Sequence, residues 1–177
     1  MSSTIAKHKA SSSTVRTGVL RHKVQKPSGA KSMVDFLIHG PSGKRDAGKD
    51  LGTTYAASKI VESIKKGLSV GELNELQTSL GIPMERLAPK LGISRATLNR
   101  RMAQGRLEPG ESDRLVRFAK LMGKAIEVFD NEENARRWLT SPQIGLGGAV
   151  PLDFAETEVG AREVEDLLGR IEYGVYS

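Results

Sequence analysis

The chain of 177 residues contains no cysteine. This absence excludes disulfide bonds, thiol nucleophiles and metal sites built from thiolates. Aromatic residues make up only 5% of the sequence, so we expect a modest core built mainly from aliphatic side chains. No apolar run approaches the roughly 18 residues that a membrane-spanning helix needs, and the basic, serine-rich N-terminus lacks the apolar stretch of a secretory signal. These features favour a cytoplasmic protein with no membrane partner.

Candidate catalytic and metal-binding residues are also scarce. The three histidines, His8, His22 and His39, lack the spacing of metal ligands. With no cysteine and no later histidine, a serine-type triad has no general base. Residues 43–50 nearly match a phosphate-binding loop, but Asp50 stands where a Ser or Thr hydroxyl would ligate magnesium. We therefore expect no metal, no cofactor and no enzymatic activity.

Charge is distributed unevenly along the chain, whose net charge is +6. Residues 1–57 carry ten Lys/Arg against three Asp/Glu, a balance of +7, and residues 58–106 carry nine against four, a balance of +5. Residues 107–177 carry eight against fourteen, a balance of −6. Such a pattern is compatible with ordinary solvated surfaces, or with a polyanionic partner for the first part and a basic partner for the last.

The first 54 residues read as a basic N-terminal arm. Residues 1–32 contain seven serines, seven Lys/Arg and no acidic or aromatic residue, so they are expected to be flexible when nothing binds them. Residues 33–38 form an isolated apolar run, short enough for a strand or a stub of helix. One interpretation of this run is an N-terminal dimer contact.

From Tyr55 to Phe129 the apolar residues recur at helical spacing, and no strong strand signal appears. Residues 51–54 look like a poor helix start. Residues 69–72 resemble a capping box in which Glu72 reaches back to the start of a helix. Pro109 is well placed to begin a long helix over residues 110–129.

Residues 84–102, MERLAPKLGISRATLNRRM, have the pattern of a helix-turn-helix. Ala88 supplies the small residue where two helices cross, and Gly92 supplies the turn. Ser94 is placed to cap the second helix, in which we expect Leu98 and Met102 to be buried. The segment resembles the Xre/Cro-like helix-turn-helix family. Pro89, inside the first helix, leaves open the alternative that the unit is only structural.

The second helix of the pair is expected to expose its polar residues to a DNA major groove. Arginine can bind guanine through two hydrogen bonds and asparagine can bind adenine likewise, and the N-terminal part of a recognition helix reads the bases. The base-reading candidates are Arg95, Thr97 and Asn99. The phosphate-contact candidates are Ser94, Arg100, Arg101 and Arg106. Because one helix-turn-helix reads only half a site, we expect a homodimer on double-stranded operator DNA.

Residues 130–177 contain two further predicted helices. Asp130 is the expected N-cap of the first, whose apolar face includes Trp138 and which ends before Pro142. A glycine-rich loop over residues 144–151 follows. The second helix starts near Thr157, and its apolar residues recur at helical spacing: Val164, Leu167, Leu168, Ile171 and Val175.

This last segment resembles the toxin-binding domain of Xre-type antitoxins from RES–Xre toxin–antitoxin pairs. The resemblance rests on the order and spacing of residues 138–139 (WL), Pro142, residues 146–148 (LGG), residues 151–152 (PL) and residues 168–174 (LGRIEYG). It implies a mainly α protein: a helix-turn-helix domain over residues 55–129, then a small helical toxin-binding domain over residues 130–177. It also implies an antitoxin that inhibits a RES-type, NAD-consuming toxin and represses its own operon.

The C-terminal helix is the segment that we expect to block the NAD pocket of that toxin. The residues expected to contact the toxin are Leu168, Arg170, Ile171, Glu172, Tyr173 and Tyr176. In the competing interpretation, Leu167, Leu168 and Ile171 pack inside this protein and the tail merely ends. A free-standing Xre-like regulator, whose acidic C-terminal part senses a ligand or oligomerises, is the alternative function.

Overall fold

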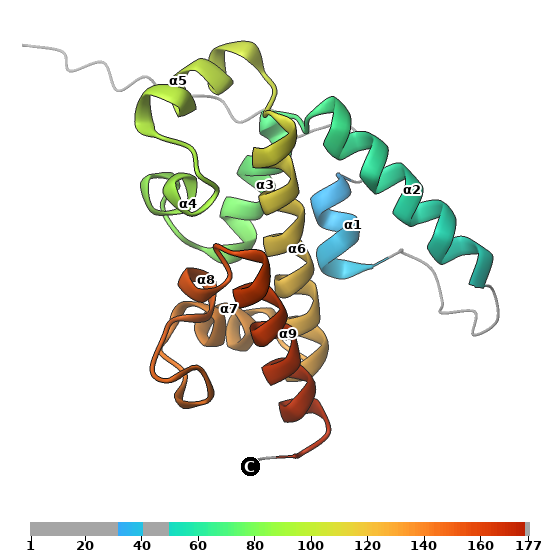
Figure 1. The fold of residues 1–177 in the computed structure, drawn as a ribbon, viewed down its shortest axis with the longest axis vertical. Helices are drawn as coiled ribbons and strands as arrows, with labels where there is room; N and C mark the ends of the chain where they lie inside the picture. The colour runs from blue at the N-terminus through green and yellow to red at the C-terminus, as the bar shows by residue number, and fades with distance from the viewer. Residues whose placement is uncertain (1–31, 41–49, 176–177) are drawn as a thin grey trace, which may run out of the picture. The chain divides into compact units, whose positions relative to one another are not determined.

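The computed structural model describes residues 32–40 and 50–175, and for residues 50–56 it describes the backbone alone. This part of the chain is helical, as Figure 1 shows, and its only β interaction is an isolated bridge between Ser69 and Arg106. The mainly α prediction is therefore confirmed. The helices are α1 (Met33–His39), α2 (Asp50–Lys66), α3 (Val70–Leu80), α4 (Met84–Lys90), α5 (Arg95–Gln104), α6 (Pro109–Phe129), α7 (Glu132–Thr140), the short 3-10 helix η1 (Ile144–Leu146), α8 (Pro151–Phe154) and α9 (Glu158–Glu172).

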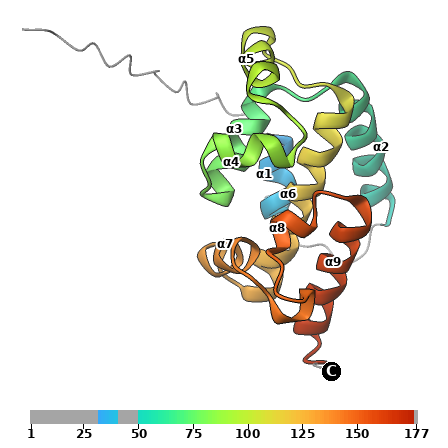
Figure 2. The ribbon, with the colours of Figure 1, turned by 60° about the vertical axis from the view of Figure 1, so that its left-hand side comes forward.

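Helix α6 is the central element of the described unit. Pro109 occupies its first turn, as predicted, where the missing amide hydrogen costs nothing. Helices α1, α2, α3, α7 and α9 all contact it, and in Figures 1 and 2 it runs between α2 on one side and α4 on the other. Its side chains Phe118, Leu121 and Met122 are fully buried. The helices before and after α6 are therefore arranged around one shared axis.

The buried apolar residues form one continuous cluster. It extends from Val34 in α1 through Leu73 in α3 and Phe118 in α6 to Leu139 in α7 and Leu168 in α9. The two predicted domains, residues 55–129 and 130–177, thus pack around a common core. No helix of the described ranges is both long and apolar enough to cross a membrane.

The apolar run at residues 33–38 forms helix α1, one of the two alternatives that its length allowed. Val34 and Ile38 are buried against this chain's own core, so these two side chains are not free for a dimer contact. Helix α1 lies very close to α6, since a Cβ atom on Gly123 would stand 2.4 Å from the carbonyl oxygen of Leu37. The rest of the predicted flexible arm, residues 1–31, lies outside the described residues.

The capping box predicted for residues 69–72 is wrong. The Ser69 side chain makes no capping hydrogen bond. The carboxylate of Glu72 instead accepts hydrogen bonds from the backbone amides of Met33, at 3.0 Å, and Val34, at 2.8 Å. These amides begin α1 and have no partner within their own helix, so Glu72 fastens α1 to α3.

The predicted start of helix α2 is also wrong. The helix begins at Asp50 and includes residues 51–54, which the sequence marked as a poor start. Intrinsic helix propensity is a weak prior that tertiary packing often overrides, and α2 packs against α6. Of the stretch that resembles a phosphate-binding loop, residues 43–49 lie outside the described residues.

Candidate functional site

Helices α4 and α5 form the predicted helix-turn-helix, and Gly92 makes its turn. Gly92 has a left-handed backbone (φ 73°), and the amide of Ile93 donates back to the carbonyl of Ala88 at 2.9 Å. This is the usual way for a helix to end at a glycine. Arg114 of α6 covers the turn: its Nη1 donates to the carbonyl of Leu91 at 3.0 Å, and a Cβ atom on Gly92 would lie 2.5 Å from that nitrogen. The turn therefore favours glycine for its backbone angle, and a side chain at this position would displace the end of Arg114.

Pro89 lies inside α4, as the sequence indicated, but the helix pair keeps its geometry. The helix continues only one residue beyond the proline, to Lys90. The carbonyl of Pro89 accepts a hydrogen bond from the amide of Gly92 at 2.8 Å. The proline thus falls where the helix is already closing.

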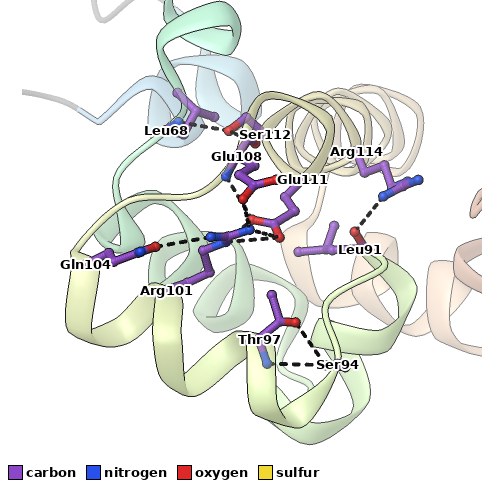
Figure 3. Close-up of polar contacts among 10 residues, drawn as sticks. All are labelled: Leu68, Leu91, Ser94, Thr97, Arg101, Gln104, Glu108, Glu111, Ser112 and Arg114. Carbon is purple, nitrogen blue, oxygen red and sulfur yellow. Dashed lines mark hydrogen bonds and ion pairs between the residues drawn. The ribbon is translucent and has the colours of Figure 1, made fainter.

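Ser94 caps α5, as predicted. Its Oγ accepts a hydrogen bond from the amide of Thr97 at 3.2 Å and lies 3.0 Å from the Thr97 hydroxyl (Figure 3). Both hydroxyls are thus engaged with each other at the start of the helix. Ser94 remains exposed, and Thr97 is half-buried.

The expected exposure of Arg101 is wrong. Its side chain is only 4% exposed, and Figure 3 shows it reaching from α5 to the start of α6. Its Nε donates to Glu111 Oε2 at 2.8 Å, its Nη2 donates to Glu111 Oε1 at 3.0 Å, and it also forms an ion pair with Glu108. With these partners Arg101 connects two helices and is not available as a phosphate contact.

Electrostatics favour the ionised form of both partners in this contact. Burial alone would raise the pKa of the Glu111 carboxyl, but the hydrogen bonds from Arg101 and from the Glu108 amide outweigh it and hold this pKa below its usual value. The pKa of Arg101 is raised, chiefly by the hydrogen bonds with Glu111. The pair is therefore a bidentate salt bridge between α5 and the central helix α6.

The outer face of α5 carries the remaining polar candidates. Arg95, Asn99 and Arg100 are exposed, and within the described ranges no intramolecular hydrogen bond engages their side chains. Ala96, which the sequence pattern did not mark, shares this face, and its methyl group suits contact with thymine. The pattern also did not mark Arg86, an exposed cation on α4.

Two apolar residues of α5 differ from expectation. Met102 was expected to be buried, but it is 42% exposed. Leu98 is half-buried and packs against the core. The helix meets the rest of the protein through Leu98 and Arg101, three residues apart on one face, and Met102 lies at the edge of that face.

Arg106, a predicted phosphate contact, has a structural role as well. Its Nη1 donates to the carbonyls of Lys66, at 3.1 Å, and Gly67, at 3.0 Å, at the end of α2. Next to it, the buried Ser112 hydroxyl accepts a hydrogen bond from the amide of Leu68 at 2.8 Å (Figure 3). These contacts fix the segment that joins α5 to α6.

The C-terminal unit begins one residue later than expected. Asn131, not Asp130, caps α7, and its side chain accepts from the amide of Asn134 at 2.9 Å. Asp130 has a left-handed backbone (φ 50°) and ends α6, so it cannot also provide the extended cap residue of α7. The predicted apolar face is confirmed, with the Trp138 ring packed against that of Phe129 at a centroid distance of 5.7 Å and an interplanar angle of 42°.

Helix α9 starts after Thr157, as predicted, but one of its proposed toxin contacts is wrong. Leu168 is completely buried in the core, so it cannot reach a partner. Ile171 is half-buried against the same core. Arg170 and Glu172 are exposed, and Glu172 accepts a hydrogen bond from Lys124 at 2.6 Å, which raises the pKa of Lys124.

After α9 the chain turns away from the helix axis. Gly174 has φ 67°, its amide donates to the carbonyl of Ile171, and the amide of Val175 donates to the carbonyl of Arg170 at 2.9 Å. These paired bonds define a glycine-terminated helix end. Tyr173 is 79% exposed there, and Tyr176 lies outside the described residues. The tail thus begins as an exposed aromatic residue on a well-capped helix.

The helix-turn-helix and the C-terminal unit are fastened to each other by polar contacts. Lys90 of α4 forms ion pairs with Asp153 and Glu156 of the C-terminal unit. Arg136 of α7 donates to the carbonyl of Ser79 in α3 at 2.8 Å. Helix α5 contacts Glu111 in the first turn of α6, and the end of α9 contacts Lys124 of the same helix. These two contacts are therefore about 20 Å apart along α6.

Comparison with known proteins gives two family matches. Residues 59–120 match the antitoxin Xre-like helix-turn-helix domain. Residues 124–174 match the antitoxin Xre/MbcA/ParS C-terminal toxin-binding domain. The two matches cover the structural units described above in the same order.

Similar proteins from several bacteria include an "Antitoxin Xre" of Yersinia enterocolitica, 40% identical over 67% of this chain and 81% of its own length. An "Antitoxin Xre" of Photorhabdus laumondii is 31% identical over 64% of this chain and 78% of its own. A "Prs ADP-ribosylating antitoxin" of Sphingobium is 28% identical over 70% of this chain and 85% of its own. With a helix-turn-helix that exposes Arg95 and Asn99, a C-terminal unit built on α7 and α9, and these relatives, the chain belongs to the Xre antitoxin family.

Proposed function

We propose that this chain inhibits a RES-type, NAD-consuming toxin by closing its active site, and that as a homodimer it represses its own operon. It acts by binding and catalyses no reaction. The observation that carries the proposal is that one continuous core joins an exposed α5 face to a toxin-binding unit whose last described residues, 172–175, are exposed.

The DNA-binding half of the proposal rests on the outer face of α5. Arg95 and Asn99 are the base-reading residues, because both are exposed near the N-terminal end of the helix. Arg100 contacts phosphate, and Ser94 and Arg106 contribute near the backbone of the DNA. Thr97, predicted to read a base, is half-buried with its hydroxyl 3.0 Å from Ser94 Oγ, so we place it with this second group. Arg101 is left out, since it holds α5 against Glu111. Two copies related by a two-fold axis would read the two halves of the operator.

The toxin-binding half rests on the end of α9. Arg170 and Tyr173 are exposed, as are Gly174 and Val175, and they combine an amphipathic aromatic ring with charge. Tyrosine and arginine are frequent among the residues that dominate binding energy. Ile171 and Glu172 support this end of the helix, and Tyr176 would extend the contact. The name of the Sphingobium relative refers to ADP-ribosylation. That reaction uses NAD, which supports an NAD-using partner.

Co-expression with a RES-type toxin that this chain is proposed to inhibit tests the proposal. A variant that ends at Glu172 keeps α9 and its ion pair to Lys124 but removes the tail. We expect it to lose protection against the toxin while it still binds operator DNA. Full protection by the truncated chain would refute the proposal that the residues after Glu172 close the active site of the toxin.

A matched control addresses the other half. The double variant Arg95→Ala, Asn99→Ala should lose operator binding and keep full protection. If this control loses protection as well, the two activities are not separated as proposed.

A further inference from the structure

The connection between α7 and α8 is a tightly closed turn. The amide of Gln143 donates to the carbonyl of Ala149 at 3.0 Å, and the amide of Gly148 donates to the carbonyl of Gln143 at 2.9 Å. The Gln143 side chain also donates to the carbonyls of Trp138 and Ser141, each at 3.0 Å. Hydrogen bonds therefore hold the base of the turn from both sides.

The same turn is anchored on the protein by apolar contacts. Leu146 is buried at 9% exposure. The backbone at Gly145 lies so close to α9 that a Cβ atom there would stand 2.7 Å from the Leu167 side chain. The turn thus packs closely against α9, and contacts within this chain hold its conformation without a partner.

Ile144 is the apolar residue that this turn presents to solvent. It is 98% exposed, more than any other large hydrophobic residue in the described part of the chain. A β-branched side chain on a fixed backbone has few rotamers to lose on binding. Burial of such a side chain by a partner would therefore stabilise a complex at little entropic cost.

The surface beside Ile144 leads to the exposed tail. Positions 163, 166, 170 and 173 recur at helical spacing on the solvent side of Leu167, the residue against which the turn packs. They place Glu163, Asp166, Arg170 and Tyr173 along one face of α9, and all four are exposed. Ile144 thus lies on a turn that packs beside this charged face, and Tyr173 lies at the C-terminal end of the face.

We infer that Ile144 is a second anchor of the toxin interface and inserts into an apolar pocket of the toxin that lies outside its active site. This inference rests on the proposed function. In this arrangement the tail closes the active site, Ile144 binds the toxin at a separate point, and the acidic residues Glu163 and Asp166 of α9 face basic groups of the toxin. The tail then provides inhibition, and Ile144 provides part of the affinity for the toxin.

Binding of purified chain to a catalytically inactive form of the cognate toxin tests the inference. We expect Ile144→Ala to weaken binding about ten- to a hundredfold, because it removes most of a buried aliphatic side chain. Ile144→Asp should weaken it further, since a charge would enter an apolar pocket. The matched control is Val61→Ala, a β-branched residue of α2 that is 50% exposed and outside the toxin-binding unit; it should change the affinity less than about twofold.

Thermal unfolding and operator binding must remain unchanged in both Ile144 variants, because a side chain 98% exposed contributes little packing to the free protein. If the parent chain binds the toxin and Ile144→Asp binds equally well, this inference fails and the proposed function stands. If the parent chain does not bind the toxin, the proposed function itself fails. A lower oligomeric mass of Ile144→Asp with unchanged toxin affinity would assign the residue to self-association and overturn the inference.

Discussion

Replacing Leu168 by alanine distinguishes the core of the toxin-binding unit from its contact surface. Leu168 is completely buried, in the same cluster as Val164 and Leu139. Its loss should therefore appear as a change in the free energy of unfolding, and toxin binding should weaken only to the extent that folding fails.

The expected size of this effect follows from the burial. A Leu→Ala change at a fully buried site typically costs about 2–5 kcal/mol, the sum of lost transfer free energy and a residual cavity. For a unit of this size, each kcal/mol lowers the midpoint of thermal unfolding by roughly 2–4 °C. A cost near the middle of the range, about 3 kcal/mol, corresponds to a fall of roughly 6–12 °C.

The assay compares Leu168→Ala with Tyr173→Ala by thermal unfolding and by protection against the toxin. Tyr173 is 79% exposed, so its loss should change stability by no more than about 0.5 kcal/mol. Protection should fall strongly for Tyr173→Ala. At a temperature where Leu168→Ala is still folded, it should protect nearly as well as the parent chain.

The opposite pattern would refute this reasoning. If Leu168→Ala unfolds like the parent chain and loses protection while folded, then Leu168 reaches the toxin directly. The assignment of the buried face of α9 would then be incorrect.

Four further predictions concern the helix-turn-helix and its contact with α6. Arg95→Ala should cost about 1–3 kcal/mol of binding to the operator and relax its specificity, whereas Arg100→Ala should weaken all DNA sequences alike and lower the salt dependence by about one ion, both measurable by titration at several salt concentrations. Gly92→Ala should destabilise the protein by about 1–2 kcal/mol in denaturant unfolding, since alanine resists the left-handed backbone and displaces Arg114; an unchanged midpoint would contradict this. Because the pKa of Glu111 is lowered in the folded state, its contribution is present above the unfolded pKa, about 4.3, and is lost as pH falls through the lower folded value. The stability gap between the parent chain and Glu111→Gln should therefore be constant near neutral pH and shrink in acid, and a gap that grows in acid would contradict this assignment.

Much of the fold was predictable because local signals agreed with packing. The turn at Gly92, the cap at Ser94 and the start of α9 after Thr157 each depend on residues within one or two helical turns. Leu168 was predictable in principle as well. Leu168 belongs to the helical repeat that defines the apolar face of α9. That repeat indicated its burial correctly, whereas the closeness of Leu168 to the C-terminal tail suggested a toxin contact.

Contacts between distant residues were not predictable in this way. Arg101 has the composition and position of a phosphate contact, and only its meeting with Glu111 on another helix buries it. Glu72 has the spacing of a capping box, yet its carboxylate binds amides 38 and 39 residues earlier in the chain. Helix periodicity specifies which residues share a face, but it does not specify which partner meets that face.

The most direct test of the central claim is the NAD consumption of the cognate toxin in the presence of increasing amounts of the purified chain. The account predicts that NAD loss stops once the chain saturates the toxin, and that a chain ending at Glu172 fails to stop it. Undiminished NAD consumption at saturating concentrations of the full chain would contradict the account.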